Sequence, residues 1–197
     1  MKNTNLTEPQ AKKIEKILSI HGDERIDEYY WLNQRGNDDV IRYLNEENDY
    51  RDEYMKDYKP LEDKIFQEIK SRIKEDDSSV PYFYNDYFYY TRYEKDKQYP
   101  IYCRKKSSLD NEEEILIDAN EMSKGYDYFR VGMIEISPDN KTMAYSIDTV
   151  SRRIYTIHFM DLETRKISDK NIPNSSGSIT WANDCLLYTS DAADDRV

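Results

Sequence analysis

Residues 80–93, VPYFYNDYFYYTRY, carry the clearest fold signal in this chain. Aromatic and β-branched residues fill two runs, Val80–Tyr84 and Tyr87–Tyr93, and such residues favour strands. Between the runs lies Asn85-Asp86, a residue pair of the type that turns one strand back against the next. The stretch therefore predicts an antiparallel hairpin, and with it a β fold for the middle of the chain.

The same alternation of short strands and turns continues to about residue 185. Further strands are predicted at Gln98–Arg104, Glu114–Asp118, Met133–Ile136, Thr142–Ile147, Arg153–Phe159 and Arg165–Ser168, and Ile179-Thr180-Trp181 begins another. Turn signals separate them, such as Ser137-Pro138-Asp139-Asn140 and Asp161-Leu162-Glu163-Thr164. Sets of four strands therefore recur at intervals of roughly 40 to 50 residues.

A repeat of four strands at this spacing is typical of β-propeller blades. A single blade cannot bury both of its faces, so it must stack against neighbours in a ring. Two blades and the start of a third cannot close such a ring, and the pattern predicts an incomplete propeller over residues 76–185. A small antiparallel sandwich of eight or nine strands would have the same turn spacing, and strand alternation does not distinguish the two.

Residues 1–75 are highly charged and have helical periodicity. Helix-like spacing first occurs at Ile14, Ile17 and Leu18. A clearer helix follows Asn37, a suitable N-cap, and runs to about Tyr58, where Lys59-Pro60 ends it. A second helix carries apolar residues at Leu61, Ile65, Phe66, Ile69 and Ile73. The sequence therefore predicts an α-helical N-terminal extension whose one-sided apolar faces need a partner surface.

Composition excludes several classes of protein. The 197 residues include 29 basic and 40 acidic ones, for a net charge of −11, and no stripe of Lys and Arg suited to nucleic acid. No apolar run approaches the roughly 18 to 20 residues of a membrane helix, and no hydrophobic signal core follows Met1. Cys103 and Cys185 have neither metal-ligand spacing nor a disulfide framework. We expect a cytoplasmic protein without nucleic-acid or membrane partners and without a cofactor or metal.

Two N-terminal motifs resemble a known family. Residues 21–32 are HGDERIDEYYWL and residues 43–48 are YLNEEN. Both are similar to motifs of the prolyl oligopeptidase family of serine peptidases, in particular of its oligopeptidase B branch. Later segments resemble the first two propeller blades of that family and the start of its third: LIDAN at 116–120, SPD at 137–139, SRRIY at 151–155, DLET at 161–164 and WAND at 181–184.

The resemblance covers about residues 8 to 185 and has three departures. Oligopeptidase B sequences often carry His at the position of Tyr126 and Gly at that of Ser151, and neither position is catalytic in the family. After Asp184, family members continue through the propeller into an α/β-hydrolase domain, whereas this chain has an off-pattern tail at residues 186–197. Leu186 to Thr189 could form a strand, but the residues after them resemble the non-native tails of contigs that run into adapter sequence.

The resemblance implies a peptidase that cleaves oligopeptides after Lys or Arg. Its Ser nucleophile lies on a G-x-S-x-G elbow in the C-terminal domain, together with the Asp and His of the triad. No two of the five glycines here are four residues apart, so the elbow is absent. We therefore assign no catalytic, cofactor-binding or metal-binding residue in this chain.

Several residues could suggest chemistry, and each has a simpler structural explanation. His21 lies in a motif whose family role is packing, and His158 lies in a predicted strand. The three basic residues after Cys103 could lower the pKa of its thiol modestly, although a structural thiol is the simpler interpretation. Trp31 and Trp181 are interpreted as packing anchors.

We interpret the chain as the leading segment of a serine oligopeptidase, inactive by itself. Its partners would be the C-terminal α/β-hydrolase domain, on which residues 1–75 would pack, and an oligopeptide admitted through the propeller. The alternative is a stand-alone β-rich binding module without catalysis, which could self-associate through open strand edges.

Overall fold

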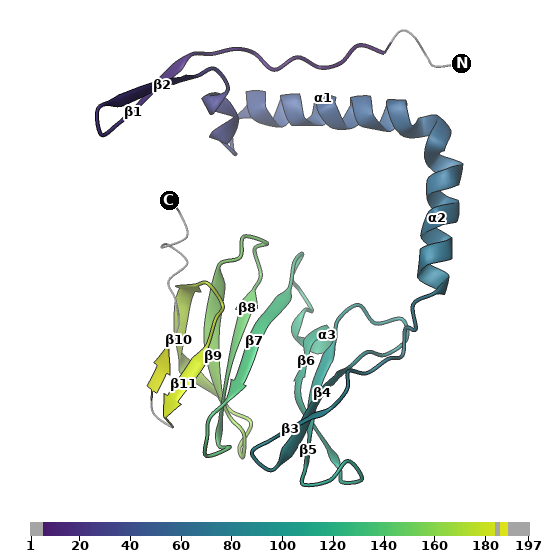
Figure 1. Cartoon of the computed structure of the whole chain (residues 1–197), viewed down its shortest axis with the longest axis vertical. Coiled ribbons are helices and arrows are strands. Elements are labelled where there is room, and N and C mark those ends of the chain that lie inside the picture. The colour runs from purple at the N-terminus through teal and green to yellow at the C-terminus, as the bar shows by residue number, and fades with distance from the viewer. Residues whose placement is uncertain (1–5, 184–185, 189–197) are drawn as a thin grey trace. The chain divides into compact units, whose positions relative to one another are not determined.

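The computed structural model describes residues 6–183 and 186–188 (Figure 1). The chain divides into two compact units, Met1–Ile73 and Lys74–Val197. This division lies two residues from the predicted boundary at residue 75. Among the described residues, no helix is both long enough and apolar enough to cross a membrane.

Unit 1 begins with a hairpin, not with a helix. Strand β1 (Lys16–Ile20) pairs antiparallel with β2 (Asp23–Asp27), and His21 and Gly22 form the turn with φ values of 51° and 84°. Two successive positive φ angles are the geometry of a tight hairpin turn, which Gly adopts without strain. The helix-like spacing at Ile14, Ile17 and Leu18 was therefore misleading, because this turn decides the local structure.

The two predicted helices are present. After a short 3-10 helix, η1 (Tyr30–Asn33), α1 (Asp38–Met55) begins at Asn37, whose side chain accepts a hydrogen bond from the backbone N–H of Asp39 at 2.9 Å. A second 3-10 turn, η2 (Lys56–Tyr58), leads into α2 (Lys59–Ser71). Pro60 lies in the first turn of α2, where its missing N–H costs nothing. Ile73 lies beyond the end of α2.

Unit 2 contains two four-stranded antiparallel sheets whose strands follow chain order. The first consists of β3 (Tyr82–Tyr84), β4 (Tyr87–Arg92), β5 (Ile101–Lys106) and β6 (Glu113–Asp118), and α3 (Ala119–Met122) follows it. The second consists of β7 (Arg130–Ile136), β8 (Thr142–Asp148), β9 (Tyr155–Asp161) and β10 (Ile167–Ser175). A hairpin of β11 (Thr180–Asn183) and β12 (Leu186–Tyr188) comes next.

The predicted turn at Asn85-Asp86 is confirmed, since the two residues have φ values of 49° and 69°. A weak strand was predicted at Arg165–Ser168. The corresponding strand, β10, begins at Ile167 and extends to Ser175, so it starts later and is longer than predicted. Strand β12 lies within the strand predicted for Leu186 to Thr189, at the start of the off-pattern tail. Residues 189–197 of that tail lie outside the described residues.

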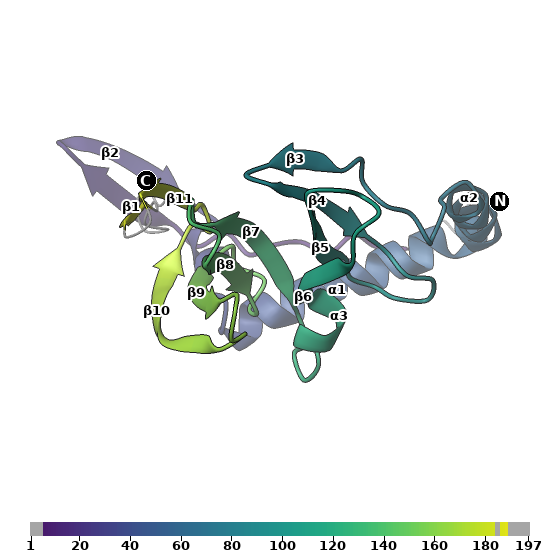
Figure 2. The same ribbon diagram turned by 90° about the horizontal axis from the view of Figure 1, so that it is seen from below.

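The main core lies between the two sheets, whose ribbons are seen from below in Figure 2. Residues of both sheets form one buried cluster, which includes Tyr89, Leu116, Ile117, Met143, Tyr145 and Met160. A second cluster forms on the opposite face of the second sheet, where Ala144 and Ile157 contact Ile179 and Trp181. The second sheet is thus covered on both faces. A two-layer sandwich leaves the outer face of each sheet uncovered, so the structure favours stacked sheets over the sandwich alternative.

Polar contacts also join the sheets at two places. Arg165, in the turn between β9 and β10, donates to the backbone carbonyls of Ile115 and Leu116 at 2.5 and 3.0 Å. At the hairpin turns, Asn85 Nδ2 donates to the carbonyl of Pro138 at 2.7 Å, and Asn140 Nδ2 donates to the carbonyl of Asn85 at 3.2 Å. These bonds fix the second sheet relative to the first.

Candidate functional site

The candidate site is a cavity of about 320 Å³ between the two sheets of unit 2, next to their first strands. Its volume is near the lower limit of small-molecule sites, which span about 300 to 1,000 Å³. The lining residues are Ser79, Tyr82, Tyr84, Tyr89, Tyr90, Thr91, Tyr102, Cys103, Leu116 and residues 132–136. Phenol rings and aliphatic side chains therefore dominate its walls.

Cross-strand pairing positions the aromatic wall. Tyr82 on β3 pairs with Tyr89 on β4, and their rings stack with centroids 5.5 Å apart. Phe83 and Phe88 form the next pair, with ring centroids 4.8 Å apart. Because strand side chains alternate between faces, the two ring pairs lie on opposite faces of the sheet.

Burial raises the pKa values of several titratable groups that line the cavity. Burial raises the pKa of Tyr82, and the nearby charge of Glu135 raises it further. Burial also raises the pKa values of Tyr102 and Glu135. The phenols are therefore protonated at neutral pH and can donate or accept hydrogen bonds. Such walls suit contacts with peptide groups but supply no nucleophile.

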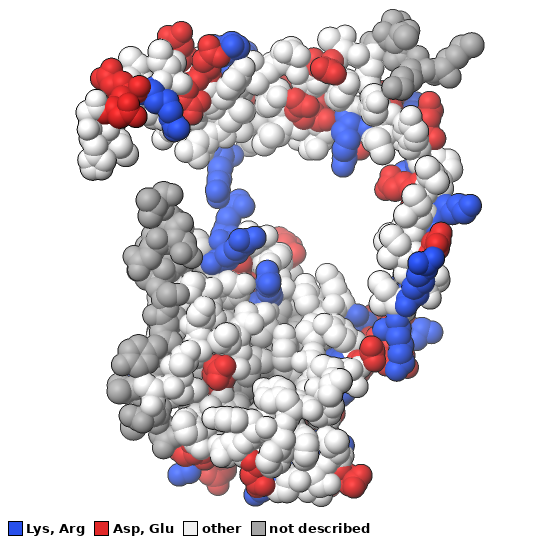
Figure 3. Space-filling model, in the orientation of Figure 1, with Lys and Arg blue, Asp and Glu red and all other residues white. Residues whose placement is uncertain are grey.

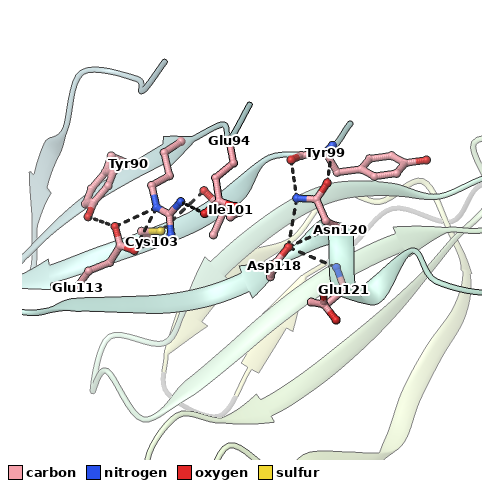
Figure 4. A network of polar contacts seen from close by, with 10 residues as sticks. Tyr90, Glu94, Tyr99, Ile101, Cys103, Glu113, Asp118, Asn120 and Glu121 are labelled. Atoms are coloured by element: carbon pink, nitrogen blue, oxygen red, sulfur yellow. Dashed lines mark hydrogen bonds and ion pairs between the residues drawn. The ribbon is translucent and has the colours of Figure 1, made fainter. Parts of the chain in front are cut away.

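A polar network supports one wall of this cavity (Figure 4). Arg92 Nε donates to both carboxylate oxygens of Glu113, at 3.1 and 3.2 Å, and the Tyr90 hydroxyl donates to the same carboxylate at 2.5 Å. Burial alone would raise the pKa of Glu113, but the hydrogen bonds from Arg92 and Tyr90 outweigh it and lower the pKa. Burial and Glu113 raise the pKa of Tyr90. The network therefore connects β4 to β6 across the intervening strand β5.

Cys103 lies beside this network, buried and free. Burial, with the charge of Glu113, raises the pKa of its thiol to about 12. The expected modest lowering by the three basic residues that follow is wrong. Among these, the guanidinium of Arg104 pairs with Glu114 at 2.6 Å and stacks on the ring of Tyr87. The thiol is thus structural, because the thiolate is the reactive form.

The two histidines lie apart from any candidate nucleophile. His21 is exposed in the β1–β2 turn, and His158 on β9 stacks on Tyr145 with ring centroids 5.4 Å apart. Burial lowers the pKa of His158. Over the described parts of the chain, no cluster of three or more His, Cys, Asp or Glu side chains is arranged to hold a metal ion.

The tryptophans pack as predicted. Trp31 Nε1 donates to the carbonyl of Lys12 at 2.8 Å, and its ring contacts that of Tyr43 with centroids 6.2 Å apart. Trp181 packs against the cluster that joins the second sheet to β11. Both therefore connect segments distant in sequence.

A separate candidate surface is the apolar face of α2 in unit 1. The predicted stripe consists of exposed side chains, with exposed fractions of 48% for Ile65, 56% for Ile69 and 60% for Phe66. Leu61, in the first turns of α2, is 55% exposed. Contiguous apolar side chains at this exposure are typical of a protein–protein contact.

Sequence reasoning did not identify the cavity. Tyr82 and Tyr89 belong to the hairpin that it predicted, but Glu135 lies on another sheet, 46 positions further along the chain from Tyr89. The alternation of tyrosines within the hairpin was the available signal. It indicates which phenols share a face, but not which strand lies across from them.

The chain matches a family model over residues 9–197, that of the N-terminal β-propeller domain of prolyl oligopeptidase. It is 39% identical to dipeptidyl aminopeptidase BI of Pseudoxanthomonas mexicana, an alignment that covers 88% of this chain and 26% of that protein. It is 36% identical to Protease 2 of Moraxella lacunata, over 92% of this chain and 28% of that protein. The chain thus spans little more than a quarter of the length of these relatives.

The fold agrees with that of solved relatives. Oligopeptidase B from Leishmania major superposes with a TM-score of 0.82 and 30% sequence identity, over 94% of this chain and 29% of that one. Oligopeptidase B from Trypanosoma brucei gives a TM-score of 0.78 at 28% identity, over 90% of this chain and 27% of that one.

Proposed function

The chain belongs to the prolyl oligopeptidase family, and we propose that it is the leading part of a serine oligopeptidase that cleaves oligopeptides after Lys or Arg. In this proposal, the sheets β3–β6 and β7–β10 are the first two propeller blades, and β11–β12 begins the third. The propeller limits access to an active site in a C-terminal α/β-hydrolase domain. The enzyme acts in the cytoplasm, with which the free thiol of Cys103 is compatible.

The stacking of the sheets carries this proposal. The second sheet buries Met143 against the first sheet and Ala144 against Ile179 of the following segment. Neighbouring residues on one strand thus face two different layers, as expected of an internal blade in a ring.

Unit 1 would supply the contact with the peptidase domain. Ile65, Phe66 and Ile69 form an exposed apolar face on α2, and burial of one such side chain is worth about 1.5 to 3 kcal/mol. A face of this size would dock strongly on a complementary surface. We therefore assign residues 1–75 to docking and residues 76–185 to the propeller.

The 197-residue chain should be inactive. In the described residues, His158 stacks on Tyr145, and the Cys103 thiol has a pKa of about 12, so neither supplies a nucleophile with its base. Activity would require the triad of the hydrolase domain, and a selective entrance would require a closed propeller.

A chimera tests the proposal. The N-terminal part of Moraxella lacunata Protease 2 that aligns with this chain would be replaced by residues 8–183 of this chain. We expect the chimera to hydrolyse arginyl and lysyl amide substrates well above an alanyl one, and the isolated chain to hydrolyse none. A double substitution on the α2 face, Ile65→Glu with Ile69→Glu, should reduce chimera activity at least about tenfold, because it places charges in an apolar contact. Ile167→Glu, at a similarly exposed position on β10 outside residues 1–75, is the matched control and should leave activity unchanged.

The alternative, a stand-alone binding module, makes a different prediction. It expects the isolated chain to form a single discrete species in size-exclusion chromatography and the chimera to be inactive. The present proposal expects a polydisperse isolated chain, because the open edges of β3 and β10 invite pairing with other chains.

A further inference from the structure

One end of unit 2 combines an aromatic hollow with unpaired positive charge. Because the strands of each sheet alternate in direction, the β4–β5, β6–β7 and β8–β9 connections lie at the same end of the sheets. We call this end, formed by residues 93–100, 119–130 and 149–154, the loop rim. Figure 1 shows the β6–β7 and β8–β9 connections there, and Figure 3 shows Lys and Arg side chains beside the latter.

The hollow in the loop rim has a volume of about 340 Å³. Its lining includes Tyr99, Tyr102, Tyr128, Phe129 and Arg130. The buried ring of Phe129 contacts that of Tyr99 edge-on, with centroids 6.0 Å apart. A hollow of this size and lining can accept one apolar or aromatic side chain.

The wall of the hollow is held rigidly. Asn120 accepts a hydrogen bond from the backbone N–H of Tyr99 at 2.9 Å and donates one to the Tyr99 carbonyl at 2.8 Å (Figure 4). Asp118 in turn accepts from the backbone N–H of Asn120 at 2.9 Å. The hollow is therefore formed before any ligand arrives, which reduces the entropy lost on binding.

Arg130 lines the hollow, and Asp148 connects it to two further arginines of the loop rim. Arg130 lies directly opposite Asp148 in the β7–β8 pairing, and cross-strand partners have Cα atoms about 4.5 to 5.5 Å apart. The backbone N–H groups of Arg152 and Arg153 donate to the Asp148 carboxylate at 3.1 and 2.9 Å. A single buried carboxylate therefore fixes the backbone at the β8 end of the loop rim.

These guanidinium groups have no internal counter-charge within hydrogen-bond distance. Both oxygens of Asp148 are used by backbone donors, since Oδ1 accepts from Val150 and Ser151 at 2.8 and 3.0 Å. Arg130, Arg152 and Arg153 are exposed, and over the described residues none forms an ion pair. Burial raises the pKa of Tyr102 and the charge of Arg130 lowers it in part, so this guanidinium acts on the hollow electrostatically.

A ligand that matches both features carries a carboxylate next to an apolar side chain. We propose that the loop rim binds the C-terminal residue of an oligopeptide, with its carboxylate at Arg130 and its side chain in the hollow. Arg152 and Arg153 add positive potential that attracts the carboxylate. This inference rests on the proposed function, since it names the part of a peptide substrate that this chain itself would contact.

Direct binding to the monomeric fraction of the 197-residue chain, isolated by size-exclusion chromatography, tests the proposal. The probes are acetyl-Ala-Ala-Phe as the free acid and as the C-terminal amide, measured by isothermal titration calorimetry at low salt. We expect the acid to bind at least about tenfold more tightly than the amide, because charge-assisted hydrogen bonds are about twice as strong as neutral ones. Arg130→Gln should remove this preference, whereas Arg25→Gln, at an exposed arginine on β2, should retain it.

Three results would overturn the inference. These are equal affinities for acid and amide, an acid preference that survives Arg130→Gln, and equally tight binding of acetyl-Ala-Glu-Ala-amide, which would indicate a general carboxylate patch. Arg130→Lys keeps the charge and should retain part of the preference, which separates a binding role from loss of the fold. The assay needs no peptidase domain, so an inactive chimera would refute the proposed function without changing these affinities.

Discussion

The contact between Tyr155 and two glycines provides a sharp test of how the layers of unit 2 pack. Gly177 has a φ of +90°, and a Cβ atom there would lie 2.7 Å from Tyr155 Cδ2. The Tyr155 ring is only 6% exposed, so it has little room to move away. Gly177→Ala therefore combines backbone strain with a steric clash.

The two contributions can be separated with other glycines of the same chain. Gly125 has a φ of +88° but open space around it, so Gly125→Ala measures strain alone. At Gly132, which has no positive φ, a Cβ would lie 2.5 Å from Ser146 Oγ and 2.8 Å from Tyr155 Cε1, so Gly132→Ala measures steric clash without backbone strain. Gly36→Ala has neither and is the control.

Magnitudes follow from each mechanism. In Gly177→Ala, the positive φ should lower the free energy of unfolding by about 1 to 2 kcal/mol and overpacking should lower it by about 1 to 3 kcal/mol. Together they should lower it by about 2 to 5 kcal/mol. Urea denaturation followed by near-ultraviolet circular dichroism measures this, because the tyrosines report on packing. A Gly177→Ala variant as stable as Gly36→Ala would refute the described packing of Tyr155.

Three further predictions concern the polar groups of the first sheet. Glu114→Gln should lower the free energy of unfolding by about 1 to 3 kcal/mol, since it leaves the guanidinium of buried Arg104 without its charged partner; urea denaturation measures the loss. The lowered pKa of Glu113 contributes stability that is present above the usual pKa of 4.5 and is lost as pH falls through the lowered value. Glu113→Gln should therefore flatten the fall in thermal midpoint between pH 5 and pH 2, a range of about three units. With its pKa near 12, the Cys103 thiol of a Cys185→Ser variant should not react with a thiol reagent at pH 8, a value about four units lower, until the chain is unfolded.

Matched controls accompany these predictions. Glu112→Gln alters an exposed residue just before β6 and should leave the urea midpoint unchanged, so an equal loss in both variants would contradict the role of Glu114. An unchanged acid transition in Glu113→Gln would mean that other carboxylates dominate. Rapid labelling of Cys103 in the folded chain would contradict its burial.

The sequence alone predicted the secondary structure correctly where local chemistry determines the backbone conformation. Asn37 predicted the start of α1 because a side-chain oxygen at that position satisfies a free N–H of the first turn. Asn85-Asp86 predicted a hairpin because the pair tolerates positive φ. At residues 14–18 the same kind of reasoning failed, because three apolar positions fit a short helix as well as a strand and the turn at His21-Gly22 selects the strand.

The tertiary structure alone decided what lies across from each strand. Side chains alternate between the two faces of a strand, so the sequence alone places Met143 and Ala144 on opposite faces of β8. Only the packing shows that each face meets a different layer. The pKa of Cys103 likewise depends on burial and on Glu113, which lies on another strand, and not on the basic residues beside it in sequence. The loop rim follows the same principle, since strand register and the buried carboxylate of Asp148 bring its arginines together. Local sequence thus determined where strands and helices begin and turn, whereas contacts between distant residues determined their chemistry, because burial and charge act through space and not along the chain.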